Sequence, residues 1–221
     1  AIIAIVAAIA IPKLLSARIA ANENAAIATL RSIAAAQQQF QSSSAIDTDA
    51  DGGGEFGFFG ELSGTSPMRI YTEAAGPTPG VDPDDILDPP FLATAFGNII
   101  DDPSSDGIVE RQGYLFKMFL PGPLAGGLIP GLAESDSSTQ GGAKAGDVTL
   151  ANWGSANCEV MWACYAWPVQ AGKTGNRAFF INQEGDVIAY DNRDNDYDGI
   201  AAAANVPAAR EFGFLDVEGG A

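Results

Sequence analysis

The chain has 221 residues, of which 28 are acidic and 11 are basic, and its formal net charge is −17. A protein this acidic repels phosphate backbones, so we expect no nucleic acid among its partners. The sequence contains no histidine, which excludes the Ser-His-Asp and Cys-His catalytic systems and the commonest zinc ligand.

The chain opens on an apolar stretch, AIIAIVAAIAIPKLL, which ends at Leu15. A membrane-spanning helix needs about 20 apolar residues, and a secretory signal needs a basic flank and a cleavage site of small residues. The stretch is too short for a membrane-spanning helix, and it lacks the basic flank and the cleavage site of a secretory signal. It is therefore either a core helix or one part of a membrane segment that begins before Ala1.

The next stretch, residues 16–41, continues the helix without glycine or proline. Its larger side chains recur every three or four residues, which predicts one stripe that packs on a partner: Ile27, Leu30, Ile33, Gln37 and Phe40. One helix of about 42 residues would be roughly 60 Å long. We expect residues 1–44 to form this helix and residues 45–221 to form an acidic globular head.

Across residues 1–41 the sequence resembles the amino-terminal helix of type IV pilins and type II secretion pseudopilins, most closely in AIIAIVAAIAIPKLLSARIAANENAAIATLRSI. The block AIAIP, here Ala8–Pro12, lies further along the helix in that family. The resemblance thus implies that the family's first residues, its glutamate and its prepilin peptidase site precede Ala1. It also implies a subunit that resides in the bacterial inner membrane before it joins identical copies in an extracellular, cell-surface helical filament. The filament core would include these residues: Ile2, Ile5, Ile9, Pro12, Leu15 and Ile19.

Pro12 predicts a break or kink in the helix. Proline has no amide hydrogen, and its ring clashes with the carbonyl four residues earlier, here that of Ala8. The resemblance to pilins implies an extended stretch at this position in assembled fibres.

Two loops carry alternating aspartates followed by glycine. They contain these residues: Asp47, Asp49, Asp51 and Gly52 in the first, and Asp194, Asp196, Asp198 and Gly199 in the second. The pattern D-x-D-x-D-G is the front half of a calcium loop, in which alternate carboxylates converge on one hard cation and the glycine permits a sharp turn. We therefore expect Ca²⁺ in at least one of the loops.

Neither loop is a complete EF-hand, because Phe58 and Asn205 stand where the motif requires glutamate. The missing oxygens would come from neighbours: Glu55 or Glu61 for the first loop, and Asp191 or Asn192 for the second. We expect the later loop to bind more strongly, since a predicted hairpin precedes it and the resemblance to major pseudopilins points to a late loop. The alternative is a pair of solvated acidic turns.

The two cysteines, Cys158 and Cys164, do not form a C-x-x-C motif and are too few for a four-cysteine zinc site. We predict a disulfide between them, as in an exported protein. The alternative is a buried pair of thiols in a reduced protein.

The carboxy-terminal part of the chain predicts a small antiparallel sheet. GYLFKMFLPG (113–122) predicts a strand, NCEVMWACYAWPVQ (157–170) predicts a buried strand and a turn, and RAFFINQEGDVIAYDN (177–192) predicts a hairpin. The glycine- and proline-rich segments 75–90 and 121–146 predict surface loops. A long helix packed on a sheet of three or four strands is an α+β fold, and the resemblance to pilins implies the same.

These features favour a calcium-stabilised structural subunit of a helical filament, with no catalytic residues. One alternative is a minor pseudopilin or a membrane-anchored, monomeric calcium-binding module. Another is a histidine-free hydrolase, which would need two carboxylates about 5–10 Å apart in a deep pocket.

Overall fold

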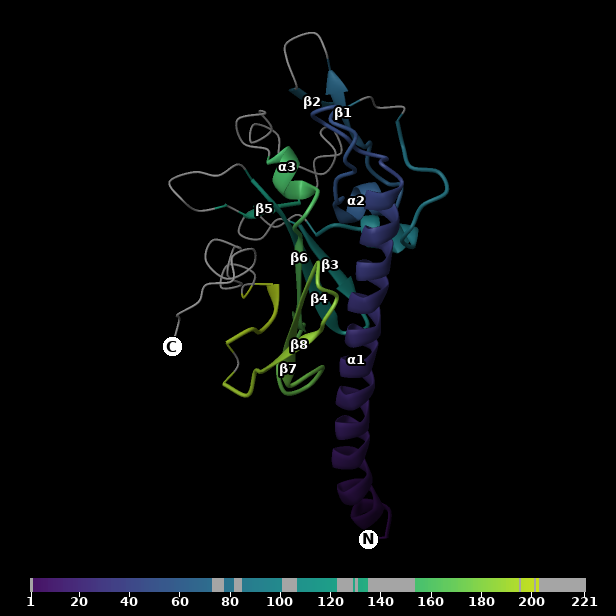
Figure 1. Ribbon diagram of the computed structural model, residues 1–221. Helices are drawn as coiled ribbons and strands as arrows, with labels where there is room; N and C mark the ends of the chain where they lie inside the picture. Colours follow the sequence, from purple (N-terminus) through teal and green to yellow (C-terminus); the bar gives the residue numbers. More distant parts are fainter. Residues whose placement is uncertain are drawn as a thin grey trace.

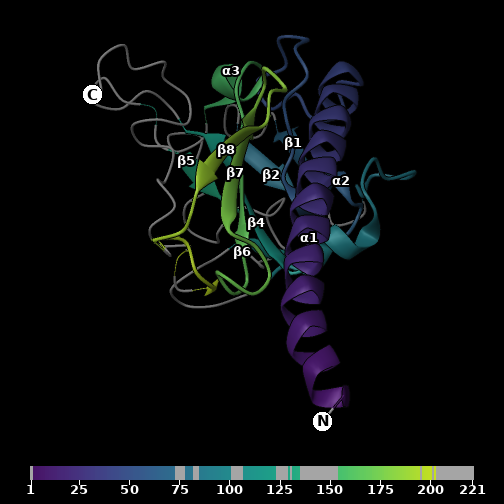
Figure 2. The ribbon, with the colours of Figure 1, turned by 90° about the horizontal axis from the view of Figure 1, so that it is seen from below.

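The computed structural model describes residues 2–72, 78–81, 85–100, 107–122, 129, 131–134, 154–194, 196–200 and 202. One long helix lies alongside an antiparallel sheet, and its amino-terminal end extends beyond the rest of the chain (Figures 1 and 2). The predicted α+β class is confirmed.

The elements have the following bounds. The helices are α1 (Ile2–Ser42), α2 (Phe59–Leu62) and α3 (Ser155–Cys158), and η1 (Thr94–Gly97) is a short 3-10 helix. The strands are β1 (Arg69–Thr72), β2 (Thr78–Val81), β3 (Ile108–Arg111), β4 (Tyr114–Pro121), β5 (Gly131–Ala133), β6 (Ala163–Pro168), β7 (Arg177–Asn182) and β8 (Ile188–Asp191).

The main sheet has six strands and is antiparallel throughout. Its order is β3-β4-β6-β7-β8, and β5 also pairs with β4. The strands predicted within 113–122 and 157–170 and the 177–192 hairpin are confirmed, but the sheet is larger than the three or four strands expected. Strand β5 lies within the segment predicted as a loop over 121–146, and β2, which pairs with β1, lies within the one predicted over 75–90.

The back half of α1 packs on the sheet through the predicted stripe. Leu30, Ile33 and Phe40 are buried in one cluster with side chains of β3, β4, β6 and β7. The polar member of the stripe, Gln37, is also buried, because its amide donates to the carbonyl of Gly57 over 2.7 Å and its oxygen accepts the Gly57 N–H over 3.0 Å. The stripe is therefore confirmed, including its polar residue.

The packing of α1 on the sheet begins near residue 22. The side chain of Asn22 donates to the carbonyl of Thr174 over 3.0 Å. The carboxylate of Glu23 accepts hydrogen bonds from Arg177 Nε over 2.7 Å and from the N–H of Asn176 over 2.9 Å. These contacts join the helix to β7 and to the turn before it.

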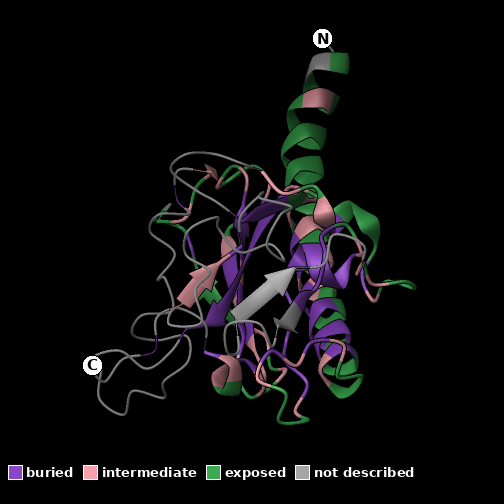
Figure 3. Cartoon of the chain, turned by 90° about the horizontal axis from the view of Figure 1, so that it is seen from above, coloured by how far each residue is buried: buried purple, intermediate pink, exposed green. Residues whose placement is uncertain are grey.

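The front half of α1 has its large apolar side chains exposed (Figure 3). The helix continues without interruption through Pro12, so the predicted break is wrong for the single chain. The physical reason is that one missing backbone bond, at the carbonyl of Ala8, is tolerated in an exposed segment where water can bind that carbonyl.

Both cysteines are free thiols, so the predicted disulfide is wrong for this structure. Cys158 ends α3, and its thiol donates to the carbonyl of Pro121 over 3.3 Å. Cys164 lies in β6, and its thiol is 3.8 Å from the carbonyl oxygen of Tyr165. Both side chains are fully buried in the helix–sheet core, where a thiol packs as a small apolar group.

Candidate metal centre

The first aspartate loop directly follows α1 and is closed by backbone contacts. The N–H of Glu55 donates to the carbonyl of Ile46 over 2.9 Å. Gly54 lies against the end of the helix, where a Cβ would overlap the carbonyl oxygen of Gln41. The glycine permits this close approach, so residues 46–55 form a compact loop rather than an extended linker.

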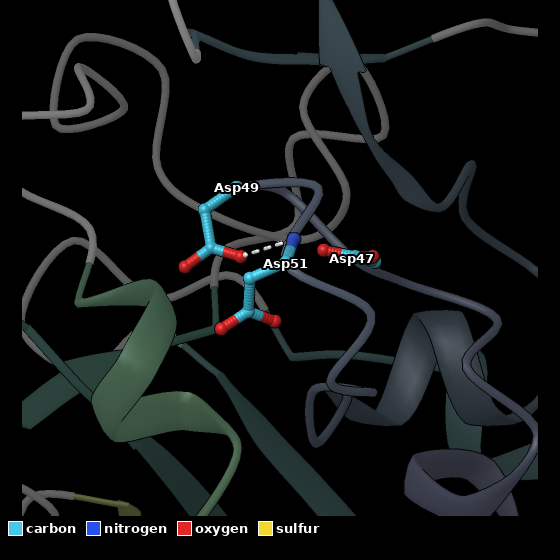
Figure 4. Close-up of side chains that lie close together, drawn as sticks. All are labelled: Asp47, Asp49 and Asp51. Carbon is cyan, nitrogen blue, oxygen red and sulfur yellow. Dashed lines mark hydrogen bonds between the residues drawn. The ribbon is translucent and has the colours of Figure 1, made fainter.

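Asp47, Asp49 and Asp51 lie close together in this loop (Figure 4), and each offers a carboxylate oxygen within 4.8 Å of the others. Backbone N–H groups of the same loop orient them. Asp47 accepts from Gly52 over 3.0 Å, Asp49 from Asp51 over 3.3 Å, and Asp51 from Gly53 over 2.7 Å. The structure thus brings together the three carboxylates that the sequence pattern predicts.

The arrangement concentrates negative charge. Two unit charges about 5 Å apart repel by roughly 1 to 3 kcal/mol as the effective dielectric constant falls from about 80 to about 20. Burial raises the pKa of Asp49, and the charges of Asp51 and Glu55 raise it further. A cation that binds between these oxygens would relieve that repulsion.

A fourth carboxylate, that of Glu159, borders the triad. Glu159 follows α3, and a Cβ at Gly53 would overlap its carboxylate, which places it against the loop. Burial raises its pKa, and so do the charges of Asp51 and Asp49. Its Oε1 atom and Oδ1 of Asp47 are both buried and have no hydrogen-bond partner among the described residues, and buried acceptors left unpaired in this way are rare in folded proteins.

Sequence reasoning did not find Glu159, because it lies far along the chain from the aspartates and in no motif with them. The fold, and not the sequence spacing, places Glu159 beside the loop. The N–H of Phe56 donates to the carbonyl of Cys158 over 2.8 Å, which holds the α3 end beside the loop.

Glu55, which the sequence suggested as a ligand, has another role. It is fully buried and forms a 2.8 Å ion pair with Arg69. Its Oε1 atom accepts from the N–H of Thr48 over 2.9 Å and from the Ser155 hydroxyl over 2.6 Å. These contacts occupy the carboxylate, so Glu55 positions the loop. The other suggested ligand, Glu61, also pairs with Arg69 over 2.8 Å.

The second aspartate loop differs from the prediction. In the described part of that loop, no three acidic side chains converge as the first triad does. Asp196 accepts from the Tyr190 hydroxyl over 2.9 Å, and Asp198 accepts from the N–H of Ala171 over 2.7 Å. Asp194 is exposed.

The two upstream residues of the second loop are also engaged elsewhere. Asp191 forms an exposed 3.4 Å pair with Arg193. Asn192 is buried and bonds both the N–H and the carbonyl of Tyr197. The expectation that the later loop is the stronger site stays a prediction, although the described side chains of that loop form hydrogen bonds to a tyrosine and to backbone groups instead of converging.

The exposed front half of α1 is a second candidate functional feature. The described part of the chain contains one helix, Ile5–Ser42, that is long and apolar enough to cross a membrane. Its most hydrophobic window has a mean hydropathy of 1.5 and buries none of its residues against the rest of the chain. This helix is compatible with association with a membrane.

Comparisons with known protein families, with characterised proteins and with solved structures find no match to this chain. The long apolar helix packed on a small antiparallel sheet is compatible with a pilin-like architecture.

Proposed function

We propose that this chain is a structural subunit of an extracellular helical filament, of the type IV pilus or pseudopilus kind. Identical copies assemble through the front half of α1, after the helix has held each subunit in the bacterial inner membrane. The head domain forms the outer surface of the fibre. The proposal includes no enzymatic activity.

The observation that carries this proposal is the division of α1 into two halves. Its back half buries Leu30, Ile33 and Phe40, whereas its front half leaves Ile3 86% and Leu14 72% exposed. An apolar patch of this kind on a soluble protein marks a surface that another molecule covers. Because the exposed side chains surround the helix on every side, several neighbours or a lipid phase would be needed to cover them.

A divalent cation in the 47–53 loop is part of the proposal. Carboxylate oxygens that converge on one point are the ligands that Ca²⁺ prefers, and its flexible coordination tolerates an irregular loop better than Mg²⁺ does. Asp47, Asp49, Asp51 and Glu159 would hold the ion, which would fasten the loop to the end of α3.

The alternative is a minor pseudopilin or a membrane-anchored monomeric module that binds calcium. The same exposed helix supports it, since lipid chains would cover the apolar side chains equally well. The two functions differ in whether copies of α1 contact one another.

Assembly of the purified full chain without detergent tests the proposal. We expect sedimentation to collect most of the protein and electron microscopy to reveal fibres of constant diameter. A chain with Ile5→Asp and Ile9→Asp should remain soluble and monomeric, because two charges in the packed front half are costly. Ser16→Asp, a charge added at an already polar, exposed position, is the control. A wild-type chain that stays monomeric, or that binds only to lipid vesicles, would exclude the filament.

A further inference from the structure

A pocket beside α1 contains a cationic side chain, one donor of which has no hydrogen-bond partner among the described residues. The pocket has a volume of about 420 Å³ and lies between the back half of α1, the segment around η1 and the turn that follows β3. Its α1 wall consists of small side chains such as Ala28, Thr29 and Ser32, and the opposite wall includes Phe96 and Arg111. The pocket thus combines one cation, hydroxyl groups and an aromatic ring.

Arg111 is held in place from two directions. It is the last residue of β3 and pairs with Tyr114 across a tight turn, in which Gln112 and Gly113 have φ values of 51° and 78°. Its guanidinium carbon lies 4.5 Å from the centroid of the Phe96 ring, which is a cation–π contact. The backbone and the ring together fix the direction of the guanidinium.

The Nη1 atom of Arg111 is buried and has no hydrogen-bond partner within the described part of the chain. Arg111 forms no ion pair with another described residue, unlike Arg69, Arg177 and Arg193. A buried donor of a charged group is rarely left unpaired in a folded protein. The acceptor that best matches a fixed guanidinium is a carboxylate, which binds two of its N–H groups in parallel.

We infer that this pocket receives a carboxylate side chain from a second copy of this chain. The inference rests on the proposed filament and specifies one contact within it. With 28 acidic and 11 basic residues in each copy, neighbouring heads meet mainly through surfaces that repel. A recessed arginine gives one of the approaching carboxylates a partner, and the small side chains on α1 leave room for it.

Substitution of Arg111 in the full chain tests this contact. Arg111→Met removes the donors and keeps an unbranched stem over Phe96. We expect the concentration needed for fibre assembly to rise by about tenfold, the effect of losing one charge-assisted contact. Arg111→Lys keeps the charge without the parallel donors. It should need a concentration for assembly between those of the wild type and Arg111→Met. Arg193→Met, at an exposed arginine that pairs with Asp191, should assemble as the wild type does, and all variants should share its thermal unfolding transition.

The outcomes separate this inference from the proposed function. If the wild type forms fibres and Arg111→Met assembles equally well, the pocket contact is wrong and the filament stands. If the wild type forms no fibres, both are wrong. If sodium propionate binds the monomeric wild type and not Arg111→Met, while Arg111→Met fibres form normally, the pocket serves a small acid and the contact between copies is overturned.

Discussion

Arg69 is the residue on which the head depends most directly. Its side chain is completely buried and contacts Glu55 over 2.8 Å, Glu61 over 2.8 Å and the carbonyl of Phe56 over 2.6 Å. One cation therefore neutralises two buried carboxylates, that of Glu55 at the end of the first aspartate loop and that of Glu61 in α2. Because Glu55 also holds Thr48 and Ser155, the ion pair determines the position of the candidate metal centre.

Arg69→Met should destabilise the protein strongly. The substitution removes the cation that pairs with both buried carboxylates, and breaking a buried ion pair in this way costs about 3–5 kcal/mol of unfolding free energy. Arg193→Met, which removes an exposed pair, should cost less than about 1 kcal/mol. Urea unfolding of both variants checks this expectation, and equal losses would show that the Arg69 network contributes no more than a surface pair.

The two thiols should be inert in the native protein. Burial raises the pKa of both Cys158 and Cys164 well above the ordinary thiol value, and the thiolate is the form that reacts. We expect a thiol reagent to label neither cysteine in native buffer and both in denaturant without reductant. Labelling of neither cysteine in denaturant would instead reveal the disulfide, and rapid labelling in native buffer would show that the core is open.

At the scale of elements, local sequence patterns correctly predicted the helix face and the strand that depend mainly on local sequence. The periodicity of Ile27, Leu30 and Ile33 identified the buried face of α1, and the apolar run of β4 identified a central strand. Strands β2 and β5 escaped prediction because their glycine- and proline-rich sequences have low strand propensity and gain stability only by pairing with β1 and β4.

The two aspartate loops show the same limit for the candidate site. Their motifs are alike, yet among the described residues only the carboxylates of the first loop converge, because the end of α3 and the Glu55–Arg69 pair enclose that loop. In the second loop, Asn192 bonds Tyr197 and the carboxylates turn to separate partners. Contacts between residues this far apart in the sequence follow from the fold and leave no signal in the motif.

The first loop should couple stability to pH and to calcium. The pKa values of Asp49 and Glu159 are raised in the folded chain, so the stability that their protonated forms contribute is complete below the ordinary carboxyl pKa. It is lost as the pH rises through the native pKa values. In calcium-free buffer, the unfolding free energy should therefore fall across this window. At pH values above this window, calcium at about a hundredfold excess over its Kd should raise the unfolding free energy by about 2.7 kcal/mol.

Variants identify the loop responsible for these effects. Asp49→Asn should reduce both the pH dependence and the response to calcium. Asp194→Asn, in the second loop, should change neither. If calcium leaves the unfolding free energy of the wild type unchanged, or if Asp194→Asn abolishes the response, the first loop is an acidic turn rather than a cation site.

The two halves of α1 should respond differently to the same substitution. Ile33 is 0% exposed, and Ile33→Ala should lower the unfolding free energy by about 2–5 kcal/mol because it leaves a cavity in the core. Ile11 is 65% exposed, and Ile11→Ala should change the unfolding free energy by less than about 0.5 kcal/mol. Chemical unfolding of the two variants measures the difference, and similar losses would mean that the front half packs on the head.

On the scale of the whole molecule, charge and apolar surface are segregated. All but one of the 28 acidic residues follow residue 44, whereas the large exposed apolar side chains gather on the front half of α1. Such a molecule can bury its apolar helix in the centre of a fibre or in a bilayer while its acidic head remains in contact with water. Head-to-tail contacts between copies that do not close into a ring would propagate as a fibre.

The most direct test of the filament is a spin label on the exposed face of α1. Ile9→Cys places the label at a position that is 59% exposed in the single chain, and the native cysteines are buried. In assembled protein we expect the label to be protected from a water-soluble relaxation agent and broadened by labels on neighbouring copies. Dilution with unlabelled protein should remove the broadening. A label that stays accessible to water, or one that is protected in vesicles without any broadening, would contradict assembly through α1.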